Sequence, residues 1–321
     1  MNNKLKIKLI AASTTTLLHT SAFAEVDLSN GSFIYSEKST SLNMLYNSRS
    51  LHQGLLGLGW CTPLEDSLDI LSATTLRLRK CRAGKIVTYK LKPNTLRAPS
   101  STAKGFLKTF ESGTEKIVSA EQKYQLIKDG QTVQTFDQHG KLLEVKDERG
   151  KVASLIYDKN GFLKDVVSGR TESLKLKVDP RSGRLTELVD AMGDHQGART
   201  RLTFLKGNLI SIAGPRKAQY FSYDSVGNLT EATDMKKITS VTYDSRDQVT
   251  SVRTSPDCSE TYEYIQSENK NQTQVITNCR GINNKRLVDF FYSKTSSGEN
   301  FLSDVSTRSS RLPANQLMGS Q

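Results

Sequence analysis

The sequence predicts an all-β protein in which an antiparallel β-meander forms the body of the chain. Three observations support this prediction: apolar and polar residues alternate over short segments, turn signals recur about every ten residues, and no helical period is sustained. Only residues 101–123 leave room for helical turns. Aspartate in the first position of a turn can bond the backbone ahead of it, and glycine in the fourth tolerates a positive φ. Asp-x-x-Gly tetrads of this kind lie at 137–140, 147–150, 158–161, 190–193 and 224–227.

The first 24 residues are typical of an export signal. Lys4, Lys6 and Lys8 form a basic start, residues 9–18 form a short apolar stretch, and Ala-Phe-Ala at 22–24 has the small-large-small pattern that a signal peptidase cleaves. The alternative is a buried first strand or helix. Cleavage would remove three of the 45 Lys and Arg and none of the 33 Asp and Glu, so the remaining chain would carry a net charge of +9.

Residues 25–65 are expected to form an N-terminal lead-in segment, and residues 66–123 a connecting region of β-hairpins. Within the second region, residues 75–80 and 86–92 are predicted to pair around a turn at 82–84. Arg77 and Arg79 alternate with leucines there, which places both arginines on one face of a strand. Together with Arg82 they are the candidate binding residues for an anionic partner, and an ordinary solvated strand face is the alternative.

Residues 124–265 contain an internal repeat. An aromatic or apolar residue precedes an aspartate, a glycine follows three positions later, and the motif recurs about every 20 residues or at a multiple of that spacing. Each unit is predicted to be a β-hairpin. The tyrosines are expected to pack as core residues, and a platform for stacking sugars is the alternative. The repeat anchors are Phe136, Asp137, Gly140, Tyr157, Asp158, Gly161, Tyr223, Asp224, Gly227, Tyr243 and Asp244.

The four cysteines form two pairs that are local in the sequence. Cys61 and Cys81 are 20 residues apart, and Cys258 and Cys279 are 21 apart. In an exported protein such spacing favours the disulfides 61–81 and 258–279, with free thiols or a metal site as the alternatives. Cys258 and Cys279 would staple a hairpin at the end of the sheet. Residues 266–293 belong to that terminal hairpin region, and the polar residues 294–321 are expected to form a flexible tail.

Two stretches of the sequence resemble a known family, the Rhs-type proteins with their YD repeat. The clearest copies of the repeat are residues 157–163, Tyr-Asp-Lys-Asn-Gly-Phe-Leu, and residues 223–230, Tyr-Asp-Ser-Val-Gly-Asn-Leu-Thr. Residues 45–48 and 54–60 are similar to the segment that precedes YD repeats in that family, although Met44 stands where the family pattern has arginine. The resemblance covers about residues 30–265 and implies a curved open sheet, part of an Rhs-type shell.

The chain also departs from the family pattern. Full-length Rhs-type proteins are several-fold longer, and their repeats enclose a toxic C-terminal domain. About six units cannot close such a shell, the D-P-x-G motif near the toxin junction is absent, and no toxin-sized domain follows Tyr264. The resemblance therefore implies a short, orphan member without a toxin tip, and the toxin-delivery role does not transfer to it.

No catalytic motif is present in the sequence. It lacks the G-x-S-x-G elbow, the P-loop, G-x-G-x-x-G and H-E-x-x-H. We therefore expect no enzyme activity, no cofactor and no metal. The turn aspartates are spaced as turn formers and not as the dense acidic pattern of calcium repeats.

The positive charge suggests an acidic partner. Three hypotheses follow. The first is an exported, periplasmic or surface protein that binds envelope glycan or another anionic polymer. The second is an assembly component that pairs through its sheet edges with another YD-repeat protein or with itself, and the third is an enzyme with an unrecognised site. Nucleic acid is not expected as a partner. No apolar run approaches the roughly 18 residues of a membrane span.

Overall fold

The computed structural model describes most of the chain from Phe23 onward. The residues described are 23–37, 42–81, 86–91, 108–112, 115–120, 122–147, 150–169, 172–191, 197–215, 217–234, 237–254, 258–267, 270–279, 282–294 and 300–311. The predicted export signal lies outside this range up to residue 22. Arg82 and His195 also lie outside it.

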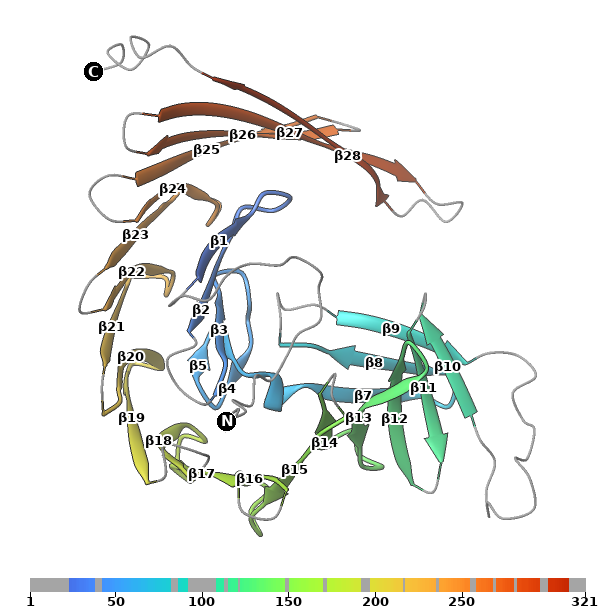
Figure 1. Ribbon diagram of the computed structural model, residues 1–321. Coiled ribbons are helices and arrows are strands. Elements are labelled where there is room, and N and C mark those ends of the chain that lie inside the picture. Colours follow the sequence, from blue (N-terminus) through green and yellow to red (C-terminus); the bar gives the residue numbers. More distant parts are fainter. Residues whose placement is uncertain are drawn as a thin grey trace, which may run out of the picture. The chain divides into compact units, whose positions relative to one another are not determined.

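The predicted all-β class is confirmed. The fold contains an open antiparallel meander of 22 strands, in which consecutive strands pair as neighbours (Figure 1). No α-helix occurs among the described residues, and a single 3-10 turn, η1, spans Pro63–Glu65. The chain divides into two compact units, which are described separately below.

Unit 1 comprises residues 36–46 and 50–216, together with the first 22 residues. Short strands come first, and a long meander follows. The strands are β3 (Met44–Asn47), β4 (Gln53–Gly54), β5 (Gly57–Leu58), β6 (Trp60–Cys61), β7 (Ser67–Ser72), β8 (Thr75–Arg79), β9 (Ile86–Leu91), β10 (Lys108–Ser112), β11 (Glu115–Ala120), β12 (Lys123–Lys128), β13 (Gln131–Phe136), β14 (Leu142–Lys146), β15 (Val152–Tyr157), β16 (Leu163–Ser168), β17 (Glu172–Val178), β18 (Leu185–Asp190), β19 (Ala198–Leu205) and β20 (Asn208–Ala213).

Unit 2 comprises residues 23–35, 47–49 and 217–321. It therefore joins the beginning of the described chain to the second half of the meander. Its strands are β1 (Phe23–Asp27), most of β2 (Ser32–Glu37), β21 (Ala218–Tyr223), β22 (Leu229–Asp234), β23 (Ile238–Tyr243), β24 (Val249–Thr254), β25 (Cys258–Gln266), β26 (Lys270–Cys279), β27 (Ile282–Lys294) and β28 (Asn300–Arg311).

Two regions differ from what the sequence predicted. Residues 108–112 and 115–120 are the paired strands β10 and β11, in a region where the sequence allowed helical turns. Residues 300–311, expected to belong to a flexible tail, form β28, which pairs along its length with β27. The prediction was wrong because β28 itself is polar, which is typical of a tail. The apolar residues that stabilise the pairing lie on β27, for example Val288 and Phe290.

A bulge recurs at the aromatic anchor of each repeat. The ladder shifts register at Phe136, Tyr157, Tyr223 and Tyr243, and the same shift occurs at Val178 and Phe204. After the bulge, each of these six anchors pairs with an apolar residue of the following strand. Those partners are Leu142, Leu163, Leu185, Leu209, Leu229 and Val249, and all are at most 4% exposed. The most uniformly buried repeat residue is therefore this leucine or valine, and not the tyrosine.

The aspartate of each repeat organises its turn. The Asp158 carboxylate accepts the backbone N–H of Asn160 and of Phe162, at 2.8 and 2.9 Å. Asp137, Asp224 and Asp244 accept the amides two and four residues ahead in the same way. This geometry explains why the turns need aspartate: its side chain satisfies amides that the bulged ladder leaves without a strand partner.

The turn glycine is required where the turn approaches another strand. Gly140 has φ +83°, and its carbonyl accepts the N–H of Leu68 at 2.9 Å. A Cβ at this position would overlap the carbonyl oxygen of Leu68. Ser67 also bridges Lys141, so the edge of β7 rests on the turn between β13 and β14. In the repeat that lacks the glycine, Asp247 takes the same left-handed conformation, with φ +58°.

Two repeat tyrosines bond the backbone of the preceding unit. The Tyr157 hydroxyl donates to the Leu142 carbonyl at 2.6 Å, and the Tyr243 hydroxyl donates to the Leu229 carbonyl at 2.8 Å. Both side chains are half-buried, and burial raises the pKa of Tyr157. Each tyrosine thus ties one repeat to its neighbour.

We expect Tyr157→Phe and Tyr243→Phe each to lower the unfolding free energy by about 1 kcal/mol, because each removes one partly buried hydrogen bond. Denaturant titration would measure this. Tyr220 is the control, because its ring is 60% exposed, and Tyr220→Phe should change stability by less than about 0.5 kcal/mol. Equal effects at all three positions would show that the hydrogen bonds of Tyr157 and Tyr243 do not stabilise the protein as expected.

Candidate functional site

The predicted basic strand is β8, and its two faces are arranged as expected. Leu76 and Leu78 are fully buried, Arg77 is half-buried and Arg79 is exposed. The Arg79 Nε donates to Asp69 Oδ2 at 2.6 Å, and Arg77 lies directly opposite Asp69 in the β7–β8 ladder. One carboxylate therefore compensates part of the charge of this strand.

A second basic surface, which the sequence analysis did not identify, lies on β17 and β19. It consists of Lys175, Lys177, Arg199 and Arg201, all exposed, and is called here the β17–β19 basic face. The neighbours of these residues in the strands, Leu174, Leu176, Thr200 and Leu202, are buried. Alternation along each strand thus places all four cations on the outer side of the sheet.

The register across β18 aligns these cations in two rows. Lys175 pairs with Val189, which pairs with Arg199. Lys177 pairs with Glu187, which pairs with Arg201. Since neighbouring strands are about 4.8 Å apart, the cations of β17 and β19 lie roughly 10 Å from one another.

Two acidic residues lie at the β17–β19 basic face: Glu187 on β18, between Lys177 and Arg201, and the half-buried Asp165 on β16, directly opposite Lys175. Glu187 is 16% exposed and accepts a hydrogen bond from Arg199 Nη1 at 3.1 Å. Four cations therefore accompany two carboxylates, which leaves a positive excess of two charges on this face. The only signals in the sequence were Lys-x-Lys at 175–177 and Arg-x-Arg at 199–201, and the pairing through β18 was needed to bring them together.

The repeat tyrosines are poorly placed to stack sugars. Tyr157, Tyr223 and Tyr243 are half-buried at the bulges, and two of their hydroxyls are bonded to backbone carbonyls. A more open aromatic ring is Tyr220 on β21, which stands opposite Thr233 on β22. This residue was not among the sequence candidates.

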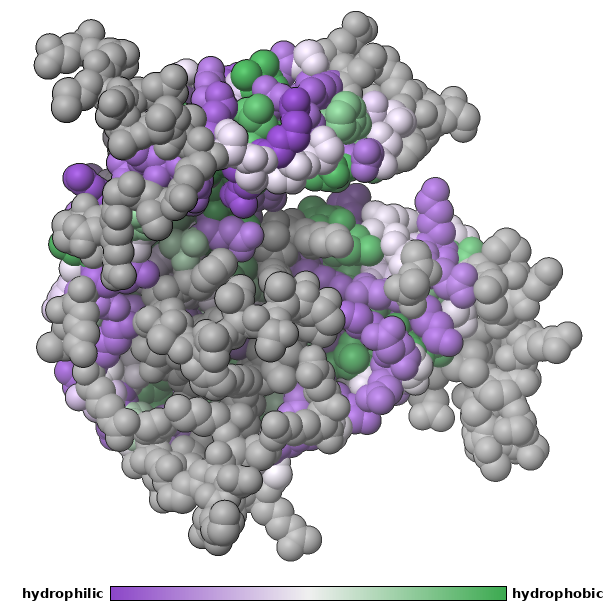
Figure 2. Space-filling view, turned by 45° about the horizontal axis from the view of Figure 1, so that its top comes forward, coloured by the Kyte–Doolittle hydropathy of each residue, from purple (hydrophilic) through white to green (hydrophobic). Residues whose placement is uncertain are grey.

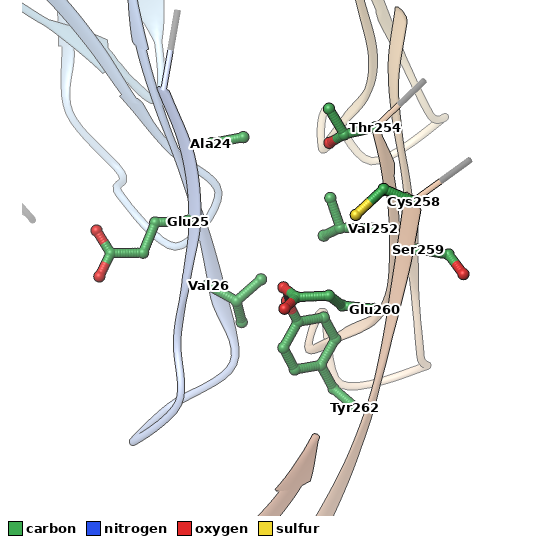
Figure 3. A pocket seen from close by; sticks show the side chains of 9 residues that line it. All are labelled: Ala24, Glu25, Val26, Val252, Thr254, Cys258, Ser259, Glu260 and Tyr262. Atoms are coloured by element: carbon green, nitrogen blue, oxygen red, sulfur yellow. Dashed lines mark hydrogen bonds between the residues drawn. The ribbon is translucent and has the colours of Figure 1, made fainter. Parts of the chain in front are cut away.

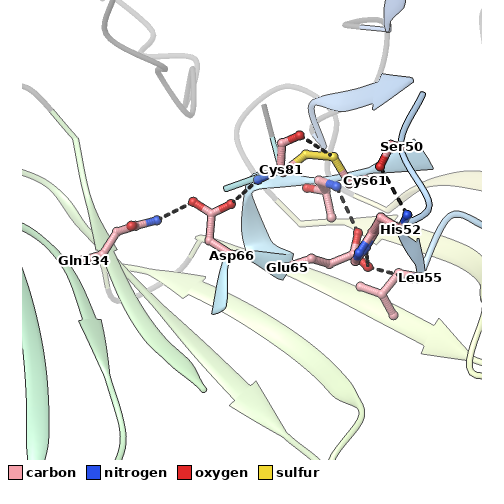
Figure 4. Close-up of a disulfide and its surroundings, with 9 residues drawn as sticks. Ser50, His52, Leu55, Cys61, Glu65, Asp66, Cys81 and Gln134 are labelled. Atoms are coloured by element: carbon pink, nitrogen blue, oxygen red, sulfur yellow. Dashed lines mark hydrogen bonds and ion pairs between the residues drawn. A yellow bond between two sulfur atoms is a disulfide. The ribbon is translucent and has the colours of Figure 1, made fainter. Parts of the chain in front are cut away.

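The disulfide between Cys61 and Cys81 lies in a dense polar cluster (Figure 4). Glu65 accepts the backbone N–H of Leu55 at 2.7 Å and of Thr62 at 2.9 Å, and His52 Nε2 lies 3.2 Å from it. Asp66 accepts the N–H of Cys81 at 2.7 Å and a side-chain N–H of Gln134 at 2.8 Å. These bonds join the lead-in segment to the first strands of the meander in unit 1.

Burial shifts the acid–base behaviour of this cluster. Asp66 is 9% exposed, and burial raises its pKa to about 6 despite the two hydrogen bonds that oppose the shift. The hydrogen bond to Glu65 raises the pKa of His52. The pKa values of both groups are thus raised, but their donors and acceptors are used within the protein, which is typical of a structural cluster.

The second disulfide, Cys258–Cys279, joins directly opposed residues of β25 and β26. Beside it is an open pocket of about 90 Å³ between β1 and the strands β24 and β25 (Figure 3). Of its two acidic residues, Glu25 points away from the pocket in Figure 3, and Glu260 already accepts from the hydroxyls of Tyr262 at 2.6 Å and Thr277 at 2.9 Å. Both predicted disulfides are thus present, and the pocket is small with its carboxylate satisfied.

Within the part of the chain that is described, no group of three or more His, Cys, Asp or Glu is arranged to hold a metal ion. No helix in the same part has the length and hydropathy needed to cross a membrane. On the side of the molecule seen in Figure 2, hydrophilic and hydrophobic residues are interspersed over the described surface.

Comparison with known proteins gives only distant matches. One similar solved structure is the Tc holotoxin pore of Photorhabdus luminescens, with 10% sequence identity and a TM-score of 0.29 over 86% of this chain, which spans 20% of that chain. Another is KlHsv2 with loop 6CD replaced by a Gly-Ser linker, with 9% identity and a TM-score of 0.14 over 88% of this chain and 97% of that one. No family model and no curated protein matches the chain.

Proposed function

We propose that this protein is an exported, non-catalytic β-sheet module that binds an anionic envelope polymer through the β17–β19 basic face. The observation that carries the proposal is the aligned set of Lys175, Lys177, Arg199 and Arg201, which outnumbers the two carboxylates beside it. A sheet face with a regular spacing of cations suits a repeating anionic glycan better than a compact ligand, because the charges are spread and exposed.

Export to the periplasm or the cell surface is part of the proposal. Two disulfides indicate an oxidising environment, and the basic and apolar start of the chain is typical of a signal. The predicted cut after residue 24 falls inside β1. We also retain the Rhs-type identity as a proposal, supported by the recurring aromatic–Asp–x–x–Gly–x–Leu geometry of the repeats.

Arg77 and Arg79 remain a second candidate surface for the same polymer. They are the sequence-predicted stripe, but Asp69 lies beside them on β7. We expect them to contribute less than the β17–β19 basic face. The two surfaces offer a matched comparison, because each has two arginines two positions apart on one strand and each has one arginine in an ion pair.

The experiment is a retention assay with the disulfide-bonded protein. Immobilised lipopolysaccharide and isolated cell-wall sacculi are the anionic probes, neutral dextran is the uncharged one, and each is tested over a salt series. Each cation near an anionic surface contributes on the order of 1 kcal/mol. Changing Lys175, Lys177, Arg199 and Arg201 together to Thr should therefore weaken binding on the order of 1,000-fold near physiological salt.

The double variants locate the effect. Arg199→Thr with Arg201→Thr should weaken binding roughly 30-fold, and Arg77→Thr with Arg79→Thr should weaken it less. A control that removes four exposed lysines elsewhere, Lys90, Lys116, Lys123 and Lys237, should leave most of the retention. Equal losses in the control and the fourfold variant would mean that net charge alone is responsible, and retention on dextran would exclude an electrostatic mode.

Assembly through a sheet edge is the second candidate function, and one observation favours it. The last strand, β28, is 12 residues long and pairs on one side with β27. A long edge strand offers backbone groups to another strand. The third hypothesis, an enzyme, stays a prediction without assigned residues.

A further inference from the structure

The edge of β28 that faces away from β27 is an exposed strand edge of unit 2. Its residues from Leu302 to Ser310 are exposed, except for Ser306, which is half-buried. Leu302 and Val305 are 49% and 47% exposed. Among the described ladders β28 has one partner strand, β27, and the 22-strand sheet is not closed into a barrel. In Figure 1 it is the last strand of the C-terminal group, after β25, β26 and β27.

The direction of the backbone groups in β28 follows from one hydrogen bond. The N–H of Val305 is bonded to the carboxylate of its own neighbour Asp304, at 2.8 Å, and so it does not donate to β27. Because backbone groups alternate in direction along an antiparallel strand, the N–H and C=O of Thr307 and Ser309 also point to the outer edge.

The charges of β28 make it complementary to itself. If two copies of the strand pair antiparallel about a two-fold axis at Ser306, Asp304 of each copy lies opposite Arg308 of the other. The same register places Val305 opposite Thr307, so that their outward backbone groups face each other, and the Val305 N–H would exchange the Asp304 carboxylate for the Thr307 carbonyl. Opposite charges and β-branched pairs facing one another across two strands stabilise a sheet.

The local charge balance leaves Arg308 available for such a contact. Its guanidinium donates to Asp289 at 3.1 Å but stays 64% exposed. Asp289 is also bonded to Lys270 at 3.1 Å and to Gln272 at 2.6 Å, so its carboxylate is compensated without Arg308. Guanidinium has five donors, and one bond to Asp289 leaves others for a carboxylate of a second strand.

From these observations we infer that β28 is a homodimerisation edge, at which a second copy of this chain adds its own β28 in the register Asp304 to Arg308 and Val305 to Thr307. The interface is isologous and closes at two copies, because each strand has one such edge. The inference does not depend on polymer binding, which is assigned to unit 1.

The test is the mass of the full, disulfide-bonded protein by sedimentation over a concentration series. We expect a dimer that dissociates on dilution. Thr307→Pro should give a monomer, because proline removes an outward N–H and leaves the ladder with β27 intact. Circular dichroism checks that this variant keeps its fold. A native protein that stays monomeric at every concentration would overturn the inference that β28 pairs with a second copy of this chain.

Charge reversal tests the register itself. Asp304→Arg places two arginines opposite each other in both pairs and should weaken the dimer on the order of tenfold or more. Arg308→Asp should weaken it similarly by opposing two aspartates. An equal mixture of the two variants should restore the dimer, because each pair then again joins one arginine to one aspartate. Failure of the mixture to recover, with both variants folded, would refute this register.

The matched control reverses an acidic residue away from the edge. Glu263 on β25 is exposed, and Glu263→Arg changes the net charge of the protein by the same amount as Asp304→Arg. It should leave the dimer unchanged. If Glu263→Arg weakens the dimer as much as Asp304→Arg does, the interface is not at β28.

Discussion

Replacement of Gly140 by alanine is expected to lower the unfolding free energy of the protein by about 3 kcal/mol. The alanine would both strain its own backbone and clash with another strand. Gly140 has φ +83°, a conformation that costs an L-residue energy, and a Cβ there would overlap the carbonyl oxygen of Leu68. That carbonyl belongs to the backbone of β7, so it cannot rotate away as a side chain could. Either β7 or the turn at 137–140 has to move.

The same substitution at Gly130 separates strain from collision. Gly130 has φ +77°, and nothing lies within 4 Å of the position where its Cβ would be. Gly130→Ala should therefore cost only the conformational part, about 1 kcal/mol. Both variants would be measured by denaturant titration with the disulfides formed. If the two losses agree within error, the contact of β7 with the turn does not contribute as described.

The second large effect is the pH dependence that Asp66 imposes on stability. Its pKa is about 6 in the folded protein and 3.8 in the unfolded chain. The folded state therefore binds more protons between these values, and the unfolding free energy decreases as pH rises from about 4 to about 6. A difference of about two pKa units corresponds to about 3 kcal/mol of unfolding free energy. This stabilisation is lost in full above pH 6.

Asp66→Asn is expected to remove this pH dependence. The asparagine amide oxygen can still accept the N–H of Cys81, and Gln134 can turn its amide to offer oxygen. The variant should match the native protein near pH 4 and exceed its stability by up to about 3 kcal/mol at pH 7. Measuring the difference between the two proteins at each pH cancels the titration of the other groups.

Those other groups act in known directions. Glu115, Asp179, Asp244 and Asp289 have lowered pKa values, so their stabilising contribution is lost as pH falls through the acidic range. His52 has a raised pKa, so its contribution is lost as pH rises above 6.5. A native-minus-variant difference that is flat from pH 4 to pH 7 would show that Asp66 is not buried as a titrating acid.

The repeat was accessible to sequence reasoning because its signals are local. Asp158 and Gly161 lie in one turn, and the carboxylate bonds amides two and four residues ahead, so spacing alone predicts the turn. The disulfides were predictable for a similar reason, because each closes a short loop between adjacent elements. What the spacing did not show is that the leucine of each repeat, such as Leu163, is more deeply buried than the tyrosine.

The candidate sites depended on contacts between residues far apart along the chain. Lys175 and Arg199 are 24 positions apart and become neighbours only through the register of β18. Arg79 looked free in the sequence and is bonded to Asp69. The polar residues 300–311 suggested a tail, yet β27 supplies the partner that makes them a strand.

The sequence by itself determined the all-β class, the turns and their aspartates, and the pairs of cysteines. Each of these follows from the conformational preferences of a few consecutive residues or from a short chain closure. The tertiary structure alone decided which cations share a face, which carboxylates neutralise them, which turn meets β7, and where the sheet presents an edge. These features follow from strand register, and a one-residue change of register would move each side chain to the opposite face of the sheet.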